Sequence, residues 1–415
     1  MTKRRIDILV YGSAQTITVD KHSTPDDIGV IDEGGVAIDN GKIIQAASSQ
    51  LLERKFSPEH TIYADDEVIM PGLVDPHTHL VFAGSREREF QERIQGRSYL
   101  GILAKGGGIL ETVSKTRQTS MSELATLAEE RARVALENGT TTLEVKTGYG
   151  LRTTDELKML QVAQILKKRQ PCRIISTFLG AHAIPRNDCE DEYTRVVIDE
   201  MLPAVRDSGL AEFCDVFCEK GAFNYKHSIA ILQAASRSGL RLKIHADQFT
   251  DSRGAEIANE IKSTSADHLV HSPFSQLGKL ARTGVTPVLL PGSSHSLLSE
   301  RRARAQEMLS LGLPVALGSD FSPSNWILGQ LAVGALAARE LRMSAEDIIR
   351  GITINAAKAL GIDRTIGSLR PGKAADLVTI KASNYKWIGY SYGEDMVDKV
   401  MIGGKLVVDG GQKIR

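Results

Sequence analysis

The sequence lacks a long hydrophobic run and a net charge, and both absences narrow what the chain can be. No stretch of about 18 consecutive apolar residues occurs, which argues against a transmembrane helix. Lys and Arg together number 51, and Asp and Glu together also number 51. No excess of positive charge therefore favours nucleic acid or an anionic membrane as a partner, and we expect a protein that binds neither.

Cysteine is also scarce, with four residues in 415. Cys214 and Cys218 form a C-x3-C pair that could hold zinc. The other two cysteines, Cys172 and Cys189, do not form a second such pair. Buried thiols in a reducing compartment are therefore expected. The apolar run behind Lys3, Arg4 and Arg5 is too short and polar for a signal peptide, which favours a cytoplasmic location.

The length of the chain suffices for a large barrel and a smaller module. Both ends are rich in short strand candidates with tight-turn signals, Asn40-Gly41 near the start and Gly403-Gly404 near the end. Neither end resembles the middle of the chain. We therefore expect residues 1–65 and 367–415 to form one composite β-sandwich module.

Residues 66–366 alternate strand and helix patterns. Helices are expected over 121–138, 155–168, 190–207 and 227–238, and from 255 onward. The strand candidates are nearly continuous apolar runs, as is typical of a parallel sheet buried on both faces. They are EVIMPGLVDPHTH, TTTLEVK, RIISTFLGAH, EFCDVFCE, LRLKIHAD, SADHLVHS, TPVLLP and LPVALGSD. Eight such units predict a (β/α)8 TIM-like barrel. A doubly wound sheet is the weaker alternative, because Gly106–Gly108 do not follow the first strand.

Polar side chains gather where these strands end, which is where a barrel carries its active site. His77 and His79 are two residues apart on a strand-like segment, so their side chains project to the same face and could grip one metal ion. An imidazole and a carboxylate from other strands would leave one position open for water. The remaining strand-end candidates are Tyr149, His182, His245, His268 and Asp320.

Several motifs together resemble the amidohydrolase superfamily: PGLVDPHTHLVF, KIHADQF, SADHLVHS and ALGSD. Within it the chain is similar to the imidazolonepropionase family, over nearly its whole length, through FAGSREREFQERIQGRSYLGILAKGGGI, TTLEVKTGYGL, STFLGAHAIP and FCDVFCEKGAF. The resemblance implies an amidohydrolase-type barrel, a homodimer and one metal ion, with Zn²⁺ expected and Fe³⁺ as the alternative. The implied metal ligands are His77, His79, His245 and Asp320.

The resemblance also implies a small-molecule substrate, 4-imidazolone-5-propanoate, and a set of residues that contact it. Arg86 can hold its carboxylate with a two-pronged hydrogen bond. Gln248 offers a donor and an acceptor to the N–C=O edge of the ring. Without the resemblance, Arg86 would be interpreted as a surface ion pair in the charged run SREREFQER. The other implied contacts are Tyr99, Tyr149 and His182.

The reaction that follows is hydrolysis of the ring amide by metal-bound hydroxide, giving N-formimidoyl-L-glutamate in histidine degradation. Asp320 would move the protons, and His268 would orient the water or polarise the carbonyl. Two further histidines lie outside this set: His271 is expected to be structural or at the rim, and His295 could reach the cavity.

The segment after Asp320 departs from the family pattern D-L-N-P-G, because Ser322 and Ser324 replace the asparagine and the glycine. Both positions are expected to face the substrate. The chain therefore acts either on the same substrate or on a related cyclic amide or imidazolone.

Other functions fit the sequence less well. A deaminase would need a glutamate at the position of Gln248, and a binuclear hydrolase would need a lysine in FCDVFCE. A scaffold that has lost its metal is opposed by the four intact ligand candidates.

Overall fold

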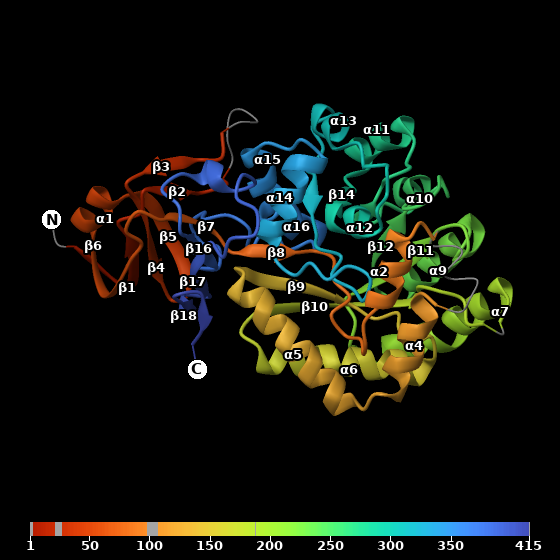
Figure 1. The fold of residues 1–415 in the computed structure, drawn as a ribbon. Helices are drawn as coiled ribbons and strands as arrows, with labels where there is room; N and C mark the ends of the chain where they lie inside the picture. The colour runs from red at the N-terminus through yellow and green to blue at the C-terminus, as the bar shows by residue number, and fades with distance from the viewer. Residues whose placement is uncertain (1–2, 21–26, 98–106, 187, 415) are drawn as a thin grey trace. The chain divides into compact units, whose positions relative to one another are not determined.

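The computed structural model describes residues 3–414 except 21–26, 98–106 and 187 (Figure 1). The chain divides into two compact units. One comprises Met1–Asp75, Arg133–Thr142 and Leu328–Arg415, and the other comprises Pro76–Ala132 and Leu143–Ile327. The boundaries near residues 65 and 367 stay a prediction, since compactness divides the chain at other points.

The predicted barrel is confirmed by an eight-stranded sheet whose neighbours follow chain order from β8 to β15. Successive pairs from β10 to β15 are parallel. A parallel bridge between Thr78 and Phe321 links the segments that follow its first and last strands. The strands are β8 (Leu73–Asp75), β9 (Thr140–Lys146), β10 (Arg173–Ala181), β11 (Phe213–Cys218), β12 (Arg241–Ala246), β13 (Ser265–His268), β14 (Thr286–Leu289) and β15 (Ala316–Leu317).

Helices occupy the segments between these strands, close to the predicted ranges. In α9 (Tyr225–Arg237) the Asn224 side chain accepts a hydrogen bond from the His227 N–H at the start, and one face buries Ile231 and Leu232. The predicted helix over 190–207 contains a π-helical turn, η1 (Val196–Met201), between α7 (Glu190–Arg195) and α8 (Leu202–Ser208). The other helices near the barrel strands include α2 (Glu87–Ile94), α4 (Ile109–Gln118), α5 (Met121–Glu137), α6 (Thr153–Arg169), α10 (Gly254–Ile261), α11 (Phe274–Thr283) and α12 (Pro291–Ser296).

The prediction that EVIMPGLVDPHTH forms one continuous strand was wrong. This segment forms two short strands in different sheets, β7 (Val68–Pro71) and the barrel strand β8. Gly72 separates them, and a Cβ atom at this position would lie 2.5 Å from Thr141 Oγ1. The close approach requires glycine, so the apolar run is interrupted where no side chain fits.

The chain ends form the predicted β module. A four-stranded sheet has the order β5-β4-β1-β6, and a seven-stranded sheet has the order β19-β18-β17-β16-β7-β2-β3. Figure 1 shows red amino-terminal and blue carboxyl-terminal strands in this part of the chain, where β7 pairs with β16 (Leu377–Ile380). The remaining strands are β1 (Arg4–Tyr11), β2 (Gln15–Ile17), β3 (Val30–Asp32), β4 (Gly34–Asp39), β5 (Lys42–Ser48), β6 (Phe56–Tyr63), β17 (Val397–Ile402), β18 (Lys405–Asp409) and β19 (Gln412–Lys413).

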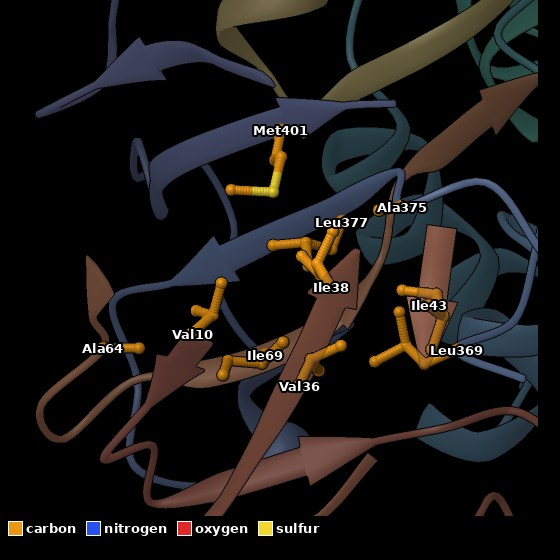
Figure 2. Close-up of a cluster of buried hydrophobic side chains, with 10 residues drawn as sticks. All are labelled: Val10, Val36, Ile38, Ile43, Ala64, Ile69, Leu369, Ala375, Leu377 and Met401. Carbon is orange, nitrogen blue, oxygen red and sulfur yellow. The ribbon is translucent and has the colours of Figure 1, made fainter. Parts of the chain in front are cut away.

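A buried apolar cluster unites residues from both ends of the chain (Figure 2). It comprises Val10, Val36, Ile38, Ile43, Ala64, Ile69, Leu369, Ala375, Leu377 and Met401. Burial stabilises each of the Val, Leu, Ile and Met side chains by roughly 1.5–3 kcal/mol relative to exposure to water. Neither chain end can form this core without the other.

The two predicted hairpin turns also meet. Asn40 and Gly41 have φ angles of +52° and +71° between β4 and β5, and Gly403 and Gly404 have +55° and +78° between β17 and β18. A Cβ atom on Gly41 would lie 2.7 Å from the Gly403 carbonyl oxygen. Glycine at these turns therefore satisfies both the left-handed backbone and the close contact.

No helix in the described ranges is both long and apolar enough to cross a bilayer.

Candidate active site

Three histidines and one aspartate converge at the end of the barrel strands. His77 and His79 follow β8, and His245 lies one residue before the end of β12. A ligating nitrogen of each histidine lies within 4.8 Å of the others. The Nε2 atoms of His77 and His79 are each 3.5 Å from Asp320 Oδ1. Ligands about 2.1 Å from a tetrahedral ion lie about 3.4 Å apart, so this spacing fits a shared metal ion.

Backbone hydrogen bonds fix the aspartate against the histidines. Asp320 lies three residues beyond the end of β15 rather than closing that strand. Its N–H donates to the His77 carbonyl at 3.0 Å, and the His79 N–H donates to the Phe321 carbonyl at 2.8 Å. These two bonds hold the carboxylate in register with both imidazoles, although Asp320 itself adopts a left-handed φ of +51°.

Burial determines the protonation of this cluster. It lowers the pKa of His77 and of His79 well below the ordinary value, so both imidazoles are neutral at neutral pH. It raises the pKa of the Asp320 carboxyl to about 6. A neutral imidazole is the form that ligates a metal, and a cation beside Asp320 would favour its anion. The donor chemistry therefore fits a metal ion.

Two buried carboxylates orient the ligand histidines from behind. His77 Nδ1 hydrogen-bonds Asp267 Oδ2 at 2.6 Å, and His245 Nδ1 lies 3.0 Å from Asp215 Oδ2. Lys146 Nζ donates to Asp215 at 2.7 Å and lies 3.6 Å from Asp267 Oδ2. Carboxylate partners of this kind fix ring orientation and raise ligand basicity.

The same network continues deeper into the barrel. Lys146 Nζ also donates to Glu144 at 3.0 Å, and Lys243 Nζ donates to Glu144 at 2.7 Å and to the Pro76 carbonyl at 2.8 Å. Burial works to lower the pKa of Lys146, but Asp215, Glu144 and Asp267 outweigh it and raise that pKa. No motif in the sequence indicates this network.

A cavity of about 360 Å³ opens onto the histidine cluster. Residues predicted as substrate contacts or catalytic groups line it: Arg86, Tyr149, His182, Gln248, His268, Asp320, Ser322 and Ser324. Tyr99 lies outside the described residues. His271 lines a separate pocket with Arg301, and neither His271 nor His295 is among the described residues that line the cavity.

Arg86 is buried, with 6% of its surface exposed, at the start of α2. The expectation from its charged neighbourhood alone, a surface ion pair, was wrong. Its nearest carboxylate is Glu89, 3.9 Å from Nη1, and Arg86 Nε has no hydrogen-bond partner among the described residues. The Arg86 N–H donates to the Pro323 carbonyl. A buried guanidinium in a cavity, with its Nε donor unsatisfied, favours an anionic ligand.

The loop after β9 and the end of β10 supply Tyr149 and His182. The His182 ring stacks on His79 with centroids 4.9 Å apart, and its centroid lies 5.3 Å from that of Tyr149. Burial lowers the pKa of His182 to about 3. Glu156 accepts hydrogen bonds from the Gly150 and Leu151 N–H groups at 2.7 and 2.8 Å, which fixes the loop that carries Tyr149.

An amide and several hydroxyls also line the cavity. Gln248 Nε2 donates to Ser293 Oγ at 3.2 Å. The Ser322 and Ser324 hydroxyls lie 3.2 Å apart, and the Ser322 N–H donates to the Asn325 carbonyl at 3.0 Å. Short hydroxyl side chains therefore stand at the two positions where the sequence departs from the family pattern.

A parallel barrel with a buried histidine–carboxylate cluster at its strand ends defines the class of metal-dependent hydrolases. The comparison with known families agrees, since the model described as the amidohydrolase family matches residues 68–407. The chain belongs to the amidohydrolase family and, within it, to the imidazolonepropionases, hydrolases that act on carbon–nitrogen bonds of cyclic amides.

Individual relatives support this assignment. The imidazolonepropionase of Alkaliphilus metalliredigens is 41% identical over 423 residues, covering 99% of this chain and 100% of the relative. That of Shouchella clausii is 43% identical over 392 residues, covering 93% and 88%. A zinc-bound adenosine deaminase from Xanthomonas campestris is similar in fold alone, with a TM-score of 0.75, 20% identity and coverage of 100% of this chain and 95% of that one.

Proposed function

We propose that this chain hydrolyses the ring amide C–N bond of 4-imidazolone-5-propanoate to give N-formimidoyl-L-glutamate, a step of histidine degradation. One observation carries the proposal beyond the family. The buried Arg86 guanidinium lines the same cavity as the histidine cluster. A substrate with a carboxylate tail and a hydrolysable ring would suit both groups.

His77, His79, His245 and Asp320 would hold the metal ion. Three imidazoles and one carboxylate favour Zn²⁺, with Fe³⁺ as the alternative, and their spacing suits one ion. When bound, the ion would polarise the ring carbonyl and lower the pKa of a water molecule. Asp267 and Asp215 would keep the rings of His77 and His245 turned toward it.

The substrate would be oriented from two sides. Arg86 would form a forked, charge-assisted hydrogen bond with the propanoate carboxylate. Tyr149 would donate to the polar edge of the substrate. His182 is neutral and its Nδ1 donates to the Gly148 carbonyl at 3.2 Å, so its Nε2 would accept a hydrogen bond there. Gln248 would pair with the ring N–C=O group. The proposed set of contacts also includes Tyr99, Ser322 and Ser324.

Asp320 and His268 would manage charge and protons during ring opening. Asp320 would accept a proton from the attacking water as the new C–O bond forms, and would pass it to the ring nitrogen as the C–N bond breaks. His268 closes β13 with 2% of its surface exposed, and its ring centroid lies 5.3 Å from that of His245. From there it would stabilise the developing negative charge on the carbonyl oxygen.

The decisive experiment is an assay on freshly generated imidazolone propionate, with hydantoin propionate and a panel of purines tested in parallel. Loss of substrate absorbance and appearance of the formimidoyl product by mass spectrometry should occur with the imidazolone alone. Turnover of hydantoin propionate instead would support a related cyclic amide as substrate. No ring opening by protein of verified metal content would overturn the proposal.

We also propose a homodimer and a cytoplasmic location, which the family resemblance and the sequence favour. Light scattering after size exclusion should give twice the chain mass of 45.1 kDa. Fractionation of the source cells should find the protein with cytoplasmic markers. Elemental analysis of protein purified without added metal should give about one zinc per chain.

A further inference from the structure

Glu219 is a buried carboxylate on the wall of the substrate cavity. It follows β11 directly, and 2% of its surface is exposed. A carboxylate in such a place could transfer protons, or it could hold other groups in position. The two roles make different demands on its oxygen atoms, because a proton acceptor needs a lone pair that faces the reacting atoms.

The oxygen atoms of Glu219 are saturated by donors from the protein. Oε2 accepts from the Phe249 N–H at 2.7 Å and from the Thr250 N–H at 3.3 Å. Oε1 accepts from the Lys220 N–H at 2.8 Å, from Ser252 Oγ at 2.9 Å and from the Thr250 hydroxyl. An ionised carboxylate offers about four acceptor sites, so these five donors leave none for a substrate proton.

Most of these donors belong to the turn that follows Gln248. On the other side of Gln248, Asp247 has a left-handed φ of +54°, and its Oδ1 accepts from the Ser252 N–H at 3.1 Å and the Gly254 N–H at 2.8 Å. Gln248 therefore lies between two residues whose backbone is fixed by buried carboxylates.

The same turn also fixes the position of Phe249, a second side chain that lines the cavity. The Phe249 ring meets Phe217 edge-on, with centroids 6.4 Å apart, and Phe217 in turn lies 5.7 Å from the His245 ring. Release of the Phe249 N–H from Glu219 would free both Gln248 and Phe249 to move.

We propose that Glu219 is a positioning residue that holds the turn 249–252, so that Gln248 and Phe249 present a fixed surface to the substrate ring. This inference rests on the proposed function, because it takes Gln248 as a substrate contact. Glu219 acts through Gln248 and does not exchange protons with the substrate.

The test is a double-mutant cycle of Glu219→Gln and Gln248→Ala. Glutamine keeps the shape of the side chain but places an NH₂ group against backbone N–H donors. Some of the hydrogen bonds that hold the turn 249–252 are therefore lost. We expect Glu219→Gln to raise KM about tenfold with kcat nearly unchanged, and both limbs of the pH profile to remain. The double variant should be no worse than Gln248→Ala alone, because both changes disable one contact.

Two outcomes would overturn the inference. A fall in kcat of about 100-fold with loss of one limb of the pH profile would make Glu219 a proton-transfer group. Additive losses in the double variant would show that Glu219 and Gln248 act independently.

Control variants keep the test decisive. Glu260→Gln is the matched control, because Glu260 accepts one hydrogen bond from the Tyr225 hydroxyl in an exposed position, and its kinetics should equal the wild type. If Glu219→Gln fails to fold, Ser252→Ala removes one donor and should raise KM a few-fold, and an unchanged KM would overturn the inference. Absence of imidazolone turnover by the wild type would instead overturn the proposed function.

Discussion

His77 and Asp267 are joined by a 2.6 Å hydrogen bond between residues 190 positions apart in the chain. The carboxylate takes the Nδ1 side of the imidazole, so the Nε2 side faces Asp320 at 3.5 Å. The orientation of a candidate metal ligand thus depends on a side chain from β13, the strand that also carries His268.

Asp267→Asn should weaken metal binding by about 10- to 100-fold, because the amide orients the His77 ring less firmly and lowers its basicity. Competition with a metal chelator measures the affinity directly. Asp207→Asn, an exposed change at the end of α8, is the matched control. Equal affinities for the two variants would contradict the role of Asp267.

Removal of the metal should abolish turnover and lower the unfolding temperature, and added Zn²⁺ should restore both. An ion that binds only the native state stabilises it by about 4 kcal/mol when its free concentration is a thousand times Kd. Calorimetry with and without chelator checks this. Purified protein that contains no metal, and whose unfolding temperature does not change when Zn²⁺ is added, would instead support a non-enzymatic scaffold function.

Arg86→Met should raise KM by about 10- to 100-fold, since charge-assisted hydrogen bonds contribute about 1.5–3 kcal/mol. Arg86→Lys should recover part of this loss, because it keeps the charge without the fork. Steady-state kinetics on imidazolone propionate separates KM from kcat. Arg97→Met, which breaks an exposed ion pair with Glu92, should leave both unchanged. If Arg86→Met keeps the wild-type KM, the substrate carboxylate binds to a residue other than Arg86.

Thiol labelling at pH 8 should modify Cys189 alone in the native protein. Cys214 and Cys218, the pair expected to be buried, are buried and free, and so is Cys172, whereas Cys189 is exposed. Burial also raises the pKa of Cys218 to about 12. Mass spectrometry after brief alkylation should find one label, and four after denaturation; rapid native labelling of Cys214 would contradict the described burial.

Ile38→Ala should lower the free energy of unfolding by about 2–5 kcal/mol, because Ile38 is fully buried in the cluster of Figure 2 and its truncation leaves a cavity. KM and kcat at a temperature where the variant is folded should stay at wild-type values. Urea denaturation gives the stability change, with Ile414→Ala, 45% exposed, as the control. A loss below about 1 kcal/mol would mean that the core collapses around the gap.

The barrel could be predicted from the sequence, and the four ligand candidates could be proposed from it, because both inferences depend on local patterns. Apolar runs of strand length alternate with helices, and His77, His79, His245 and Asp320 stand at or just beyond strand ends. Arg86 is different. Its charged neighbours in sequence favour a surface ion pair, and the family resemblance implies a substrate contact instead. In the structure Arg86 lines the cavity.

The network behind the ligands could not be predicted from the sequence. Glu144 and Lys146 alternate with Leu143 and Val145 in a strand that the sequence predicts to be buried, and this alternation does not indicate which residues the two charges meet. Here the whole of β9 is buried, and its polar face meets carboxylates and lysines from other strands. Which charges pair inside a barrel depends on strand order around the ring, and no spacing along one strand contains that information.

The two backbone hydrogen bonds that join the segment 77–79 to Asp320 and Phe321 form a seam, and the seam restricts how this enzyme can be redesigned. A slip of one residue would turn Thr78, instead of His77 and His79, toward the cavity, because neighbouring side chains on an extended segment face opposite ways. Insertions or deletions at 318–319 would therefore disable the catalyst even where the barrel still closed. Efforts to broaden the substrate range should therefore keep the number of residues between β15 and Asp320 unchanged. Ser322 and Ser324 are better positions to vary, because they line the cavity and take no part in the two hydrogen bonds to the segment 77–79.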